Sequence, residues 1–280
     1  MNNDVAFLTT IFPMKREYLY DFFNSLTHQT YKKFDLIVVN DGYENFDEIK
    51  REFCSFPIIE LKYSSTPAKN REYGINYIKD NNYGILVFGD SDDYFEENRI
   101  EKSIELLSSF DIVVNDVSLV NGNGIYSEKY FSNRIKNNFE IYLNFIYKKN
   151  LFGLSNTSIN VQILENICFE KNLIAVDWYL YTVLLLRKFR AIFTNDTVTF
   201  YRQYLGNTIG LNHLSNEQME KGILVKIKHY DLLKNENEVL NALSKKMHIF
   251  KKNYENCVIP PTLPKVKNPF WWEEVQLYEE

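Results

Sequence analysis

The chain has 280 residues, of which 45% are hydrophobic and 25% are charged, and its formal net charge at pH 7 is -5. A chain of this length and composition can bury a sizeable core, as one large domain or one and a half ordinary domains. The acidic balance disfavours a general nucleic-acid-binding protein, which usually carries a basic face, and the lack of a long apolar segment predicts no membrane-spanning helix.

The N-terminus and the cysteines indicate the compartment. The first residues, MNNDVAFLTTIF, have no basic segment and only a brief apolar run, so we interpret them as a first strand rather than a signal peptide. Cys54, Cys168 and Cys257 lie far apart, without the paired spacings of a zinc or redox site. Reduced thiols in a cytoplasmic protein are the simplest interpretation.

Strand and helix patterns alternate along the first 114 residues. Short apolar runs predict strands at residues 5–11, 34–39, 58–63, 85–88 and 111–114. Segments with helical spacing separate them, at residues 17–28, 46–53, 68–79 and 96–107. This alternation predicts an α/β fold, a doubly wound sheet of parallel strands joined by right-handed crossovers.

The pattern changes after residue 115. The turn sequence Asn-Gly-Asn-Gly at residues 121–124 predicts a hairpin. We then expect helices at residues 139–149 and 176–188, a mixed segment at 155–169, and strands at 191–193 and 197–201. Residues 215–253 are helical in pattern and rich in lysine, and a tail punctuated by proline leads to Phe270, Trp271 and Trp272.

The stretch YGILVFGDSDDYFEEN places three carboxylates directly after a predicted buried strand. Ligands of open α/β sheets bind beyond the carboxyl ends of the strands, so Asp90, Asp92 and Asp93 are expected beside a substrate crevice. In an extended segment Asp90 and Asp92 point the same way and can converge on one hard divalent ion. The alternative is a solvated turn followed by the first turn of a helix, where acidic residues are also favoured.

Two further aspartates are candidate functional residues. Asp41 follows the second predicted strand in an Asn-Asp-Gly sequence, which is also ordinary turn chemistry. Asp177 lies among apolar neighbours, which favour its protonated form, at the start of a predicted helix, which opposes that effect. The alternative for Asp177 is a helix N-cap.

Five segments, in order, resemble the GT-A fold glycosyltransferases of family 2, which are inverting enzymes that use nucleotide-sugar donors. They are QTYKKFDLIVVNDG, NREYG, GDSDD, VDWYLYTVLLLRK and YRQYLGNTIG, at residues 29–42, 70–74, 89–93, 176–188 and 201–210. Five ordered motifs are jointly more specific than any one of them. The resemblance implies a GT-A catalytic domain at residues 1–210, followed by a helical region and an extended aromatic tail at residues 211–280.

The resemblance also implies roles for the acidic residues. Asp92 would bind a divalent metal, Mn²⁺ or Mg²⁺, directly, and Asp90 would approach the ribose or a metal-bound water. Asp93 would brace the loop. Asp41 would accept a hydrogen bond from N3 of uracil, and Asp177 would be the catalytic base.

Further nucleotide contacts follow from the same resemblance. Thr9 and Thr10 would form the other wall of the base pocket, Arg71 would approach from the third helix, and Arg202 would neutralise phosphate. Trp178 offers a flat face for a sugar, although an aromatic residue at a helix start is more often part of a core.

Two positions depart from the family pattern. The glutamate expected before the base is Val176, and the histidine expected two residues after Arg202 is Tyr204. His213 is a candidate substitute for that imidazole, although a lone histidine in a polar loop is usually solvated. These departures make a non-catalytic, glycan-binding relative a second hypothesis, which the retention of the aspartates opposes.

The expected function is therefore an inverting, metal-dependent transfer from a nucleotide sugar, with a UDP-sugar as the expected donor, to a glycan or lipid-linked acceptor, in the synthesis of a bacterial surface polysaccharide. A sugar-nucleotide nucleotidyltransferase is a third hypothesis, but TTIFPMKRE lacks the glycine-rich phosphate loop of such enzymes.

The C-terminal region allows two interpretations. Its lysines and aromatic residues are typical of helices with solvated faces and buried tryptophans, or of a peripheral contact with an anionic membrane surface at its inner face. The lysines in question are Lys226, Lys228, Lys245, Lys246, Lys251 and Lys252.

Overall fold

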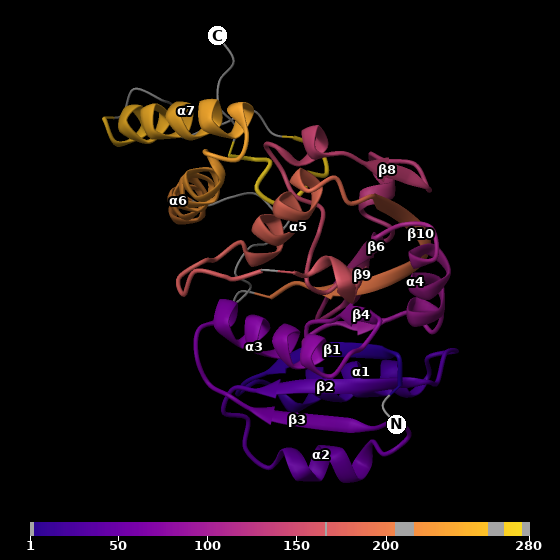
Figure 1. Cartoon of the computed structure of the whole chain (residues 1–280). Helices are drawn as coiled ribbons and strands as arrows, with labels where there is room; N and C mark the ends of the chain where they lie inside the picture. The colour runs from indigo at the N-terminus through magenta and orange to yellow at the C-terminus, as the bar shows by residue number, and fades with distance from the viewer. Residues whose placement is uncertain (1–2, 166, 205–215, 257–265, 276–280) are drawn as a thin grey trace.

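A mixed sheet of ten strands forms the centre of the part of the chain that this computed structural model describes, residues 3–165, 167–204, 216–256 and 266–275. Helices flank the sheet, and its main strands follow the order β3-β2-β1-β4-β9-β6-β10-β5 (Figure 1). This agrees with the predicted α/β class, a GT-A-like sheet with helices after it.

The first four strands are parallel, as the alternation predicted. They are β1 (Val5–Ile11), β2 (Phe34–Asn40), β3 (Ile58–Lys62) and β4 (Ile85–Phe88). The helices that connect them are α1 (Arg16–Thr27), α2 (Phe46–Glu52) and α3 (Pro67–Asp80). Every connection crosses from one parallel strand to the next through a helix, so the carboxyl ends of these strands all lie at one edge.

Alternating residues of β1 supply two separate cores. Phe7 packs in the cluster that contains the apolar side chains of α1, with its ring 5.9 Å from that of Phe22. Leu8 belongs to the cluster on the opposite face, together with Ile75 of α3. A strand covered on both faces has no solvated side, which explains why its sequence is continuously apolar.

The second half of the sheet departs from the doubly wound prediction. β9 (Thr157–Asn160) lies antiparallel between β4 and β6 (Ile112–Asn121), within the segment that the sequence left as mixed. The two predicted strands near residues 191–201 are one strand, β10 (Ala191–Arg202), with a shift of register between Thr194 and Val198. β5 (Tyr94–Phe95) pairs antiparallel with β10, and α4 (Arg99–Leu107) packs against β10.

The helix predicted at residues 139–149 is wrong. The segment forms β8 (Phe139–Ile141), which is antiparallel to β10, and the 3₁₀ helix Leu143–Ile146. Within β8 the side chains alternate, because Ile141 is buried while Glu140 reaches out to Arg190 at 3.2 Å. The predicted hairpin at residues 121–124 is confirmed by β7 (Gly124–Ser127), which pairs with β6.

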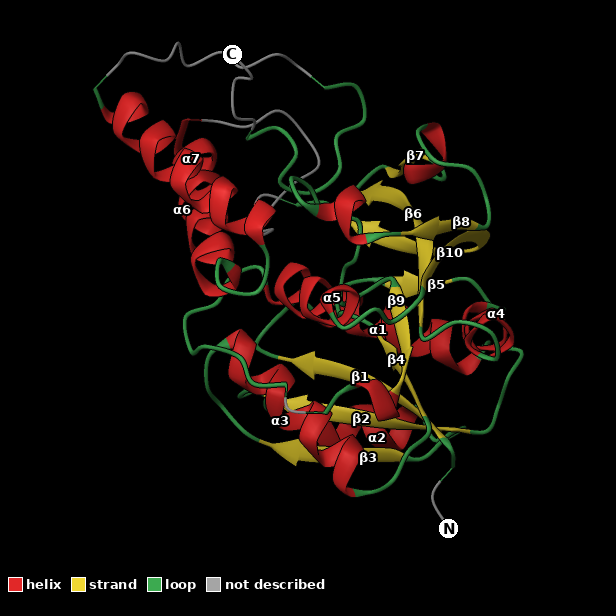
Figure 2. Ribbon diagram, turned by 45° about the horizontal axis from the view of Figure 1, so that its top comes forward, coloured by secondary structure: helices red, strands yellow, loops and turns green. Residues whose placement is uncertain are grey.

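The two C-terminal helices, α6 (Asn216–Leu233) and α7 (Glu238–Glu255), lie together at the end of the molecule opposite β1, β2 and β3 (Figures 1 and 2). The helix α5 (Val176–Leu186) lies between them and the sheet. Among residues 3–165, 167–204, 216–256 and 266–275, no helix has the length and apolarity needed to cross a bilayer.

The tail confirms one C-terminal interpretation and corrects part of it. Trp271 and Trp272 are buried, at 6% and 8% exposure, as expected for tryptophans packed on the rest of the chain. Lys226, however, is not on a solvated face, because it is 2% exposed and donates to the carbonyl oxygen of Lys148 at 2.8 Å. Lys245, Lys246 and Lys252 are exposed, as predicted.

Gly89, which links β4 to the acidic loop, allows a stability prediction. A Cβ atom there would lie 2.5 Å from the ring of Phe7 and 2.6 Å from that of Phe95. We expect Gly89→Ala to lower the free energy of unfolding by roughly 1–3 kcal/mol, because the two rings are packed and cannot both move away. Urea unfolding measures this, with Gly122→Ala as the control, since a Cβ at Gly122 meets nothing within 4 Å. Equal stabilities of the two variants would contradict the prediction.

Candidate active site

The carboxyl ends of β1, β2 and β4 lie at one edge of the sheet, because β1 pairs in parallel with both neighbours, and hydrogen bonds to the end of β1 tie them together. The amide of Asp41, after β2, donates to the carbonyl of Ile11 at 2.8 Å. The hydroxyl of Ser91, after β4, donates to the carbonyl of Thr10 at 2.7 Å. The structure therefore brings the predicted residues Thr9, Thr10, Asp41 and the Asp90–Asp93 loop to one edge.

Asp41 is held by a residue that the sequence argument did not use. The side-chain amide of Asn70, on α3, donates to the Asp41 carboxylate at 2.7 Å. The Asn70 amide oxygen and the Thr9 hydroxyl are buried and have no hydrogen-bond partner among the residues that the structure describes. Buried polar atoms of this kind usually bond to water or a ligand, so the wall predicted for a nucleobase carries hydrogen-bonding capacity that the described residues leave unused.

Arg71, one residue further along α3, reaches the acidic loop. Its guanidinium donates to the Asp90 carboxylate at 2.9 Å, and both side chains are partly exposed, at 23% and 33%. Arg71 therefore lies beside the acidic loop, while its predicted contact with a nucleotide stays a prediction. A guanidinium beside a carboxylate at the mouth of the site provides one positive and one negative group for a polar ligand.

Asp92 bonds to Tyr204, the residue that replaces the expected histidine. The Tyr204 hydroxyl donates to the Asp92 carboxylate at 2.7 Å, and the Tyr204 ring lies 5.8 Å from that of Tyr18. Burial raises the pKa of Asp92, and the nearby negative charge of Asp90 raises it further. The position of the missing imidazole is thus occupied by a hydroxyl that touches the predicted metal ligand.

Asp93 braces the loop, as expected. It is 1% exposed, and its carboxylate accepts from the Arg202 amide at 2.7 Å and from the Ser155 hydroxyl. The Arg202 guanidinium donates to the carbonyl of Asp92 at 2.8 Å and to Asp21 at 2.7 Å. Arg202 therefore lies at the acidic loop and supports it, while its predicted contact with phosphate stays a prediction.

The predicted metal site consists of the carboxylates of Asp90 and Asp92. In the described parts of the chain, no group of three or more His, Cys, Asp and Glu side chains is arranged to hold a metal ion. Mg²⁺-type ions are commonly held by one or two carboxylates together with substrate phosphates and waters, so the pair is a sufficient protein contribution. A cation between them would also relieve the repulsion that raises the pKa of Asp92. The donor set therefore fits a hard divalent ion that binds with its substrate.

Asp177 lies in the first turn of α5, one residue after the helix begins at Val176. It is therefore not the N-cap, since that position belongs to Ala175. Burial raises the pKa of Asp177 to about 7, against the backbone amide of Trp178 and the charge of Arg71, which lower it. The charge of Asp90 raises the same pKa, so Asp177 shares one electrostatic environment with the acidic loop.

A carboxyl group with a pKa about 7 is suited to accept a proton near neutral pH. The amide of Asn150 donates to its Oδ2 atom at 3.3 Å, a contact across 27 residues that no local pattern indicated. No sequence pattern indicated Ser155 either. Asn70 belongs to the NREYG segment, and a polar residue at a buried position of a predicted helix could have indicated its role.

Trp178 and His213 were the remaining candidates for the site. Trp178 is fully buried and donates to the carbonyl of Ile146 at 2.9 Å, while its ring stacks on His229 at 3.9 Å. It is therefore a core residue, and the sugar-stacking alternative is wrong. His213 lies outside the described residues.

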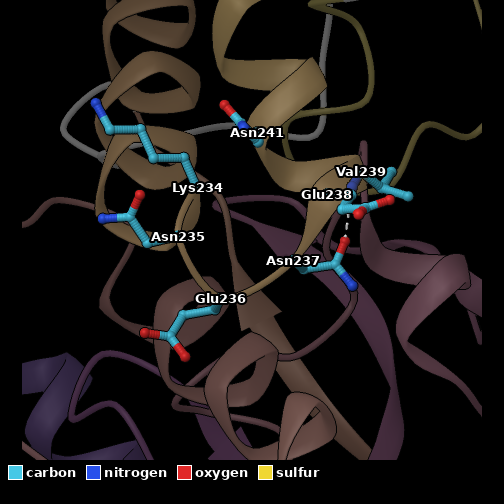
Figure 3. Close-up of a pocket in the computed structure, with 7 residues that line it drawn as sticks. All are labelled: Lys234, Asn235, Glu236, Asn237, Glu238, Val239 and Asn241. Carbon is cyan, nitrogen blue, oxygen red and sulfur yellow. Dashed lines mark hydrogen bonds between the residues drawn. The ribbon is translucent and has the colours of Figure 1, made fainter.

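A surface cavity of about 660 Å³ lies at the turn between α6 and α7 (Figure 3). Its lining includes none of the predicted site residues, and Asn237 in it caps α7 by accepting from the amides of Val239 and Leu240 at 2.9 and 3.3 Å. The polar lining thus has a structural use, and the candidate site is the strand edge instead.

Known structures share this fold. The structure resembles that of S. aureus TarS residues 1–349, with a TM-score of 0.60 and 17% identity over 91% of this chain and 74% of that chain. For the same fragment in complex with UDP-GlcNAc the TM-score is 0.59, with 17% identity over 91% and 75% of the two chains. For its complex with UDP the TM-score is 0.55, with 14% identity over 92% of each. At these identities the likeness concerns the fold.

Sequence comparison gives the family. No curated protein sequence matches the chain. The family model described as glycosyl transferase family 2 matches residues 9–168, which is more than half of the chain and includes the strand edge with Thr9, Asp41, Arg71 and the acidic loop. The chain is therefore a member of glycosyl transferase family 2.

Proposed function

We propose that this protein is an inverting glycosyltransferase that moves a sugar from a UDP-sugar to a hydroxyl group of a glycan or lipid-linked acceptor. The observation that carries the proposal is the meeting of Asp41, Arg71, Asp90 and Asp92 at one strand edge, within the electrostatic reach of Asp177. A UDP-GlcNAc complex is known for the similarly folded TarS, which supports a uridine nucleotide as the donor.

The residues at the strand edge would bind the nucleotide. Asp41, fixed by Asn70, would accept a hydrogen bond from the base, and the Thr9 hydroxyl, which has no partner among the described residues, would contribute to the same wall. Asp90 would approach the ribose. The guanidinium groups of Arg71 and Arg202 both contact this acidic loop, at Asp90 and at the carbonyl of Asp92, and would bind phosphate.

Asp177 would act as the base. The acceptor oxygen attacks the anomeric carbon, its proton passes to the Asp177 carboxylate, and the bond from the anomeric carbon to the diphosphate oxygen breaks, with the electron pair leaving on the diphosphate. A single displacement of this kind inverts the anomeric centre. A divalent ion held by Asp92, with Asp90 beside it, would neutralise the charge that develops on the leaving diphosphate.

We also propose a biological role for this transfer reaction, the synthesis of a bacterial surface polysaccharide. Surface-polysaccharide synthesis at the inner face of a membrane is compatible with the exposed lysines Lys245, Lys246 and Lys252 on α7, which give that helix a basic surface. The acceptor and the sugar depend on the shape of loops around the site.

Nucleotide selectivity tests the proposal. We expect calorimetric titration to show binding of UDP but weaker binding of GDP and CMP. Asp41 would accept the N3 hydrogen of uracil, whereas N3 of cytosine carries no hydrogen and guanine is a larger, two-ring base. Binding is expected to strengthen when Mn²⁺ is present, since phosphate and carboxylates share the ion. No binding of any nucleotide, with or without Mn²⁺, would contradict the proposed function.

A further inference from the structure

Asn150 is fully buried and contacts the proposed base. It lies between the 3₁₀ helix Leu143–Ile146 and β9, and its side chain is held by the backbone of Phe152. The Asn150 Oδ1 atom accepts from the Phe152 amide at 3.0 Å, and Nδ2 donates to the Phe152 carbonyl at 2.6 Å. Its second Nδ2 hydrogen is directed to Oδ2 of Asp177 at 3.3 Å. The two contacts with Phe152 therefore fix the orientation of the Asn150 amide independently of Asp177.

The backbone of Asn150 is in turn held by the C-terminal strap, by which we mean Phe270–Val275. The Asn150 amide donates to the carbonyl of Trp271 at 2.9 Å, and the two residues form an isolated antiparallel bridge. The Trp271 ring packs edge-on against Tyr201, at 5.6 Å between ring centres, and a Cβ at Gly153 would lie 3.3 Å from it. The strap therefore lies beside Gly153 and Tyr201, which come shortly before Ser155 and Arg202, the two residues that bind Asp93.

Glu273 connects the strap to Arg134 and Lys149. It is 9% exposed, its carboxylate binds the guanidinium of Arg134 through two contacts, one of them at 3.0 Å, and it accepts from the Phe270 amide at 2.9 Å. Lys149, directly before Asn150, lies 3.7 Å from the same carboxylate. A buried carboxylate with this many partners resists displacement, because removing it from them would leave buried charges unpaired.

Lys226 of α6 anchors the end of the strap. Its ammonium donates to the carbonyl of Val275 at 2.6 Å and to that of Lys148 at 2.8 Å, so it joins the strap to the segment that leads into Asn150. Burial lowers the pKa of Lys226 to about 7. The space between α6 and the strap is also closed, since a Cβ at Gly222 would lie 2.5 Å from Val275.

We propose that Asn150 is a positioning residue for Asp177, and that the strap Phe270–Val275 holds Asn150 in register, so that the C-terminal tail is part of the catalytic unit. This rests on the proposed function, in which Asp177 is the base. The strap is then needed for the orientation of a carboxylate that lies far before Trp271 in the sequence.

The chemistry of this contact is specific. A hydrogen bond from Asn150 stabilises the ionised form of Asp177, which is the form that accepts a proton. The backbone amide of Trp178 also donates to this carboxylate, to Oδ1 at 2.8 Å. The charged and titratable groups that interact with it are Arg71 on α3, Asp90 after β4 and Tyr181 on α5 itself. Replacing Asn150 leaves all of them in place, so its effect on the ionisation of Asp177 is separable from theirs.

The test compares Asn150→Ala with the wild type in pH–rate profiles of sugar transfer. We expect the lower limb of the kcat profile to move up by roughly 1 pH unit, because a hydrogen bond to the charged form is lost. At pH 6.5 (chosen below the expected limb) kcat is expected to fall by roughly 3–10-fold, as the ionised fraction falls with the shift, while the donor KM stays nearly unchanged. An unmoved profile would overturn the proposal.

Asn160→Ala is the matched control. Like Asn150, Asn160 donates from one side-chain amide to two acceptors, here the carbonyls of Leu107 and Phe110, each at 3.1 Å, but it makes no contact with Asp177. We expect it to lower the melting temperature without moving the pH profile. If both variants move the profile equally, Asn150 is only structural.

A second arm tests the strap. Trp271→Ala should move the profile in the same direction as Asn150→Ala, and the double variant should move it no further than Asn150→Ala alone, since the strap acts through Asn150. Additive shifts would overturn the strap's role. If Trp271→Ala does not fold, Trp271→Phe takes its place with the same expectations.

A direct titration separates this inference from the proposed function. Carbon-13 NMR of aspartate carboxyl groups, with the Asp177 signal assigned through Asp177→Asn, reports the ionisation of Asp177 without any substrate. A wild type that transfers no sugar from any UDP-sugar tested would contradict the proposed function. If the pH at the midpoint of the Asp177 titration is the same in Asn150→Ala as in the wild type, the proposed effect of Asn150 on Asp177 is contradicted.

Discussion

Replacing Asp177 by asparagine is expected to lower kcat for sugar transfer by roughly 10²–10⁴-fold, the contribution usual for a positioned general base. The amide keeps the shape of the carboxyl group but cannot accept the acceptor's proton. Binding of UDP is expected to stay within about twofold of the wild type, because a residue that acts only in the chemical step contributes little to ground-state binding. Steady-state kinetics and calorimetry measure the two quantities.

The pH dependence of the wild type belongs to the same prediction. Because the pKa of Asp177 is about 7, the ionised base is present above that pH and is lost as the pH falls below it, so activity should decline on the acidic side of neutrality. The raised pKa also means that the folded chain holds this proton more tightly than the unfolded chain. Its contribution to the free energy of unfolding therefore decreases as the pH rises from near the ordinary value of 3.8 to about 7.

Asp80→Asn is the control for Asp177→Asn. Asp80 is an exposed aspartate at the C-terminal end of α3, the helix whose first turns carry Asn70 and Arg71. Its neutralisation should leave kcat unchanged. Full activity in Asp177→Asn, or an equal loss in both variants, would rule out Asp177 as the base.

Replacing Asp92 by asparagine is expected to remove most of the Mn²⁺-dependent gain in UDP affinity and to lower kcat by roughly 10²–10³-fold, comparable to the removal of one group that stabilises transition-state charge. An amide oxygen is a weaker ligand for a hard cation than a carboxylate. Calorimetry with and without Mn²⁺, followed by kinetics, measures both effects.

Stability separates this loss from unfolding. Burial and the negative charge of Asp90 raise the pKa of Asp92, so its ionised form is unfavourable where it lies. We therefore expect Asp92→Asn to melt no lower than the wild type in metal-free buffer. Asp47→Asn is the control, because Asp47 is exposed on α2 and its ion pair with Lys50 lies on the surface. If Asp92→Asn binds UDP and Mn²⁺ as well as the wild type does, Asp92 has only a structural role in its loop and does not bind the metal.

Much of the site could be predicted from local sequence because strand ends and loop residues have local signatures. Gly89 and the aspartates after β4 follow an apolar run, and Asn40-Asp41-Gly42 follows another, so both were placed at the sheet edge. Once parallel pairing of β1 with β2 and β4 is given, these ends must meet.

The roles of Tyr204 and Asn150 were beyond such patterns. From the sequence, Tyr204 was only a missing histidine, whereas its hydroxyl reaches Asp92 across 112 residues. Asn150 directly follows the segment 139–149, which the sequence pattern predicted to be a helix. The structure instead forms β8 and a 3₁₀ helix there, and β8 is recognised only by its pairing with β10. An amide that serves one distant carboxylate leaves no periodicity that a single sequence reveals.

The sequence by itself determined the strand and helix alternation of residues 5–107, the α/β class and the acidic strand edge, because side-chain period, turn residues and apolar runs act within a few positions of each other. Tertiary structure decided that β9 enters antiparallel between β4 and β6, and that the strap reaches Asn150 beside Asp177. Strand order and the contacts of a buried amide depend on packing between distant segments, and that packing is fixed only when the whole core closes.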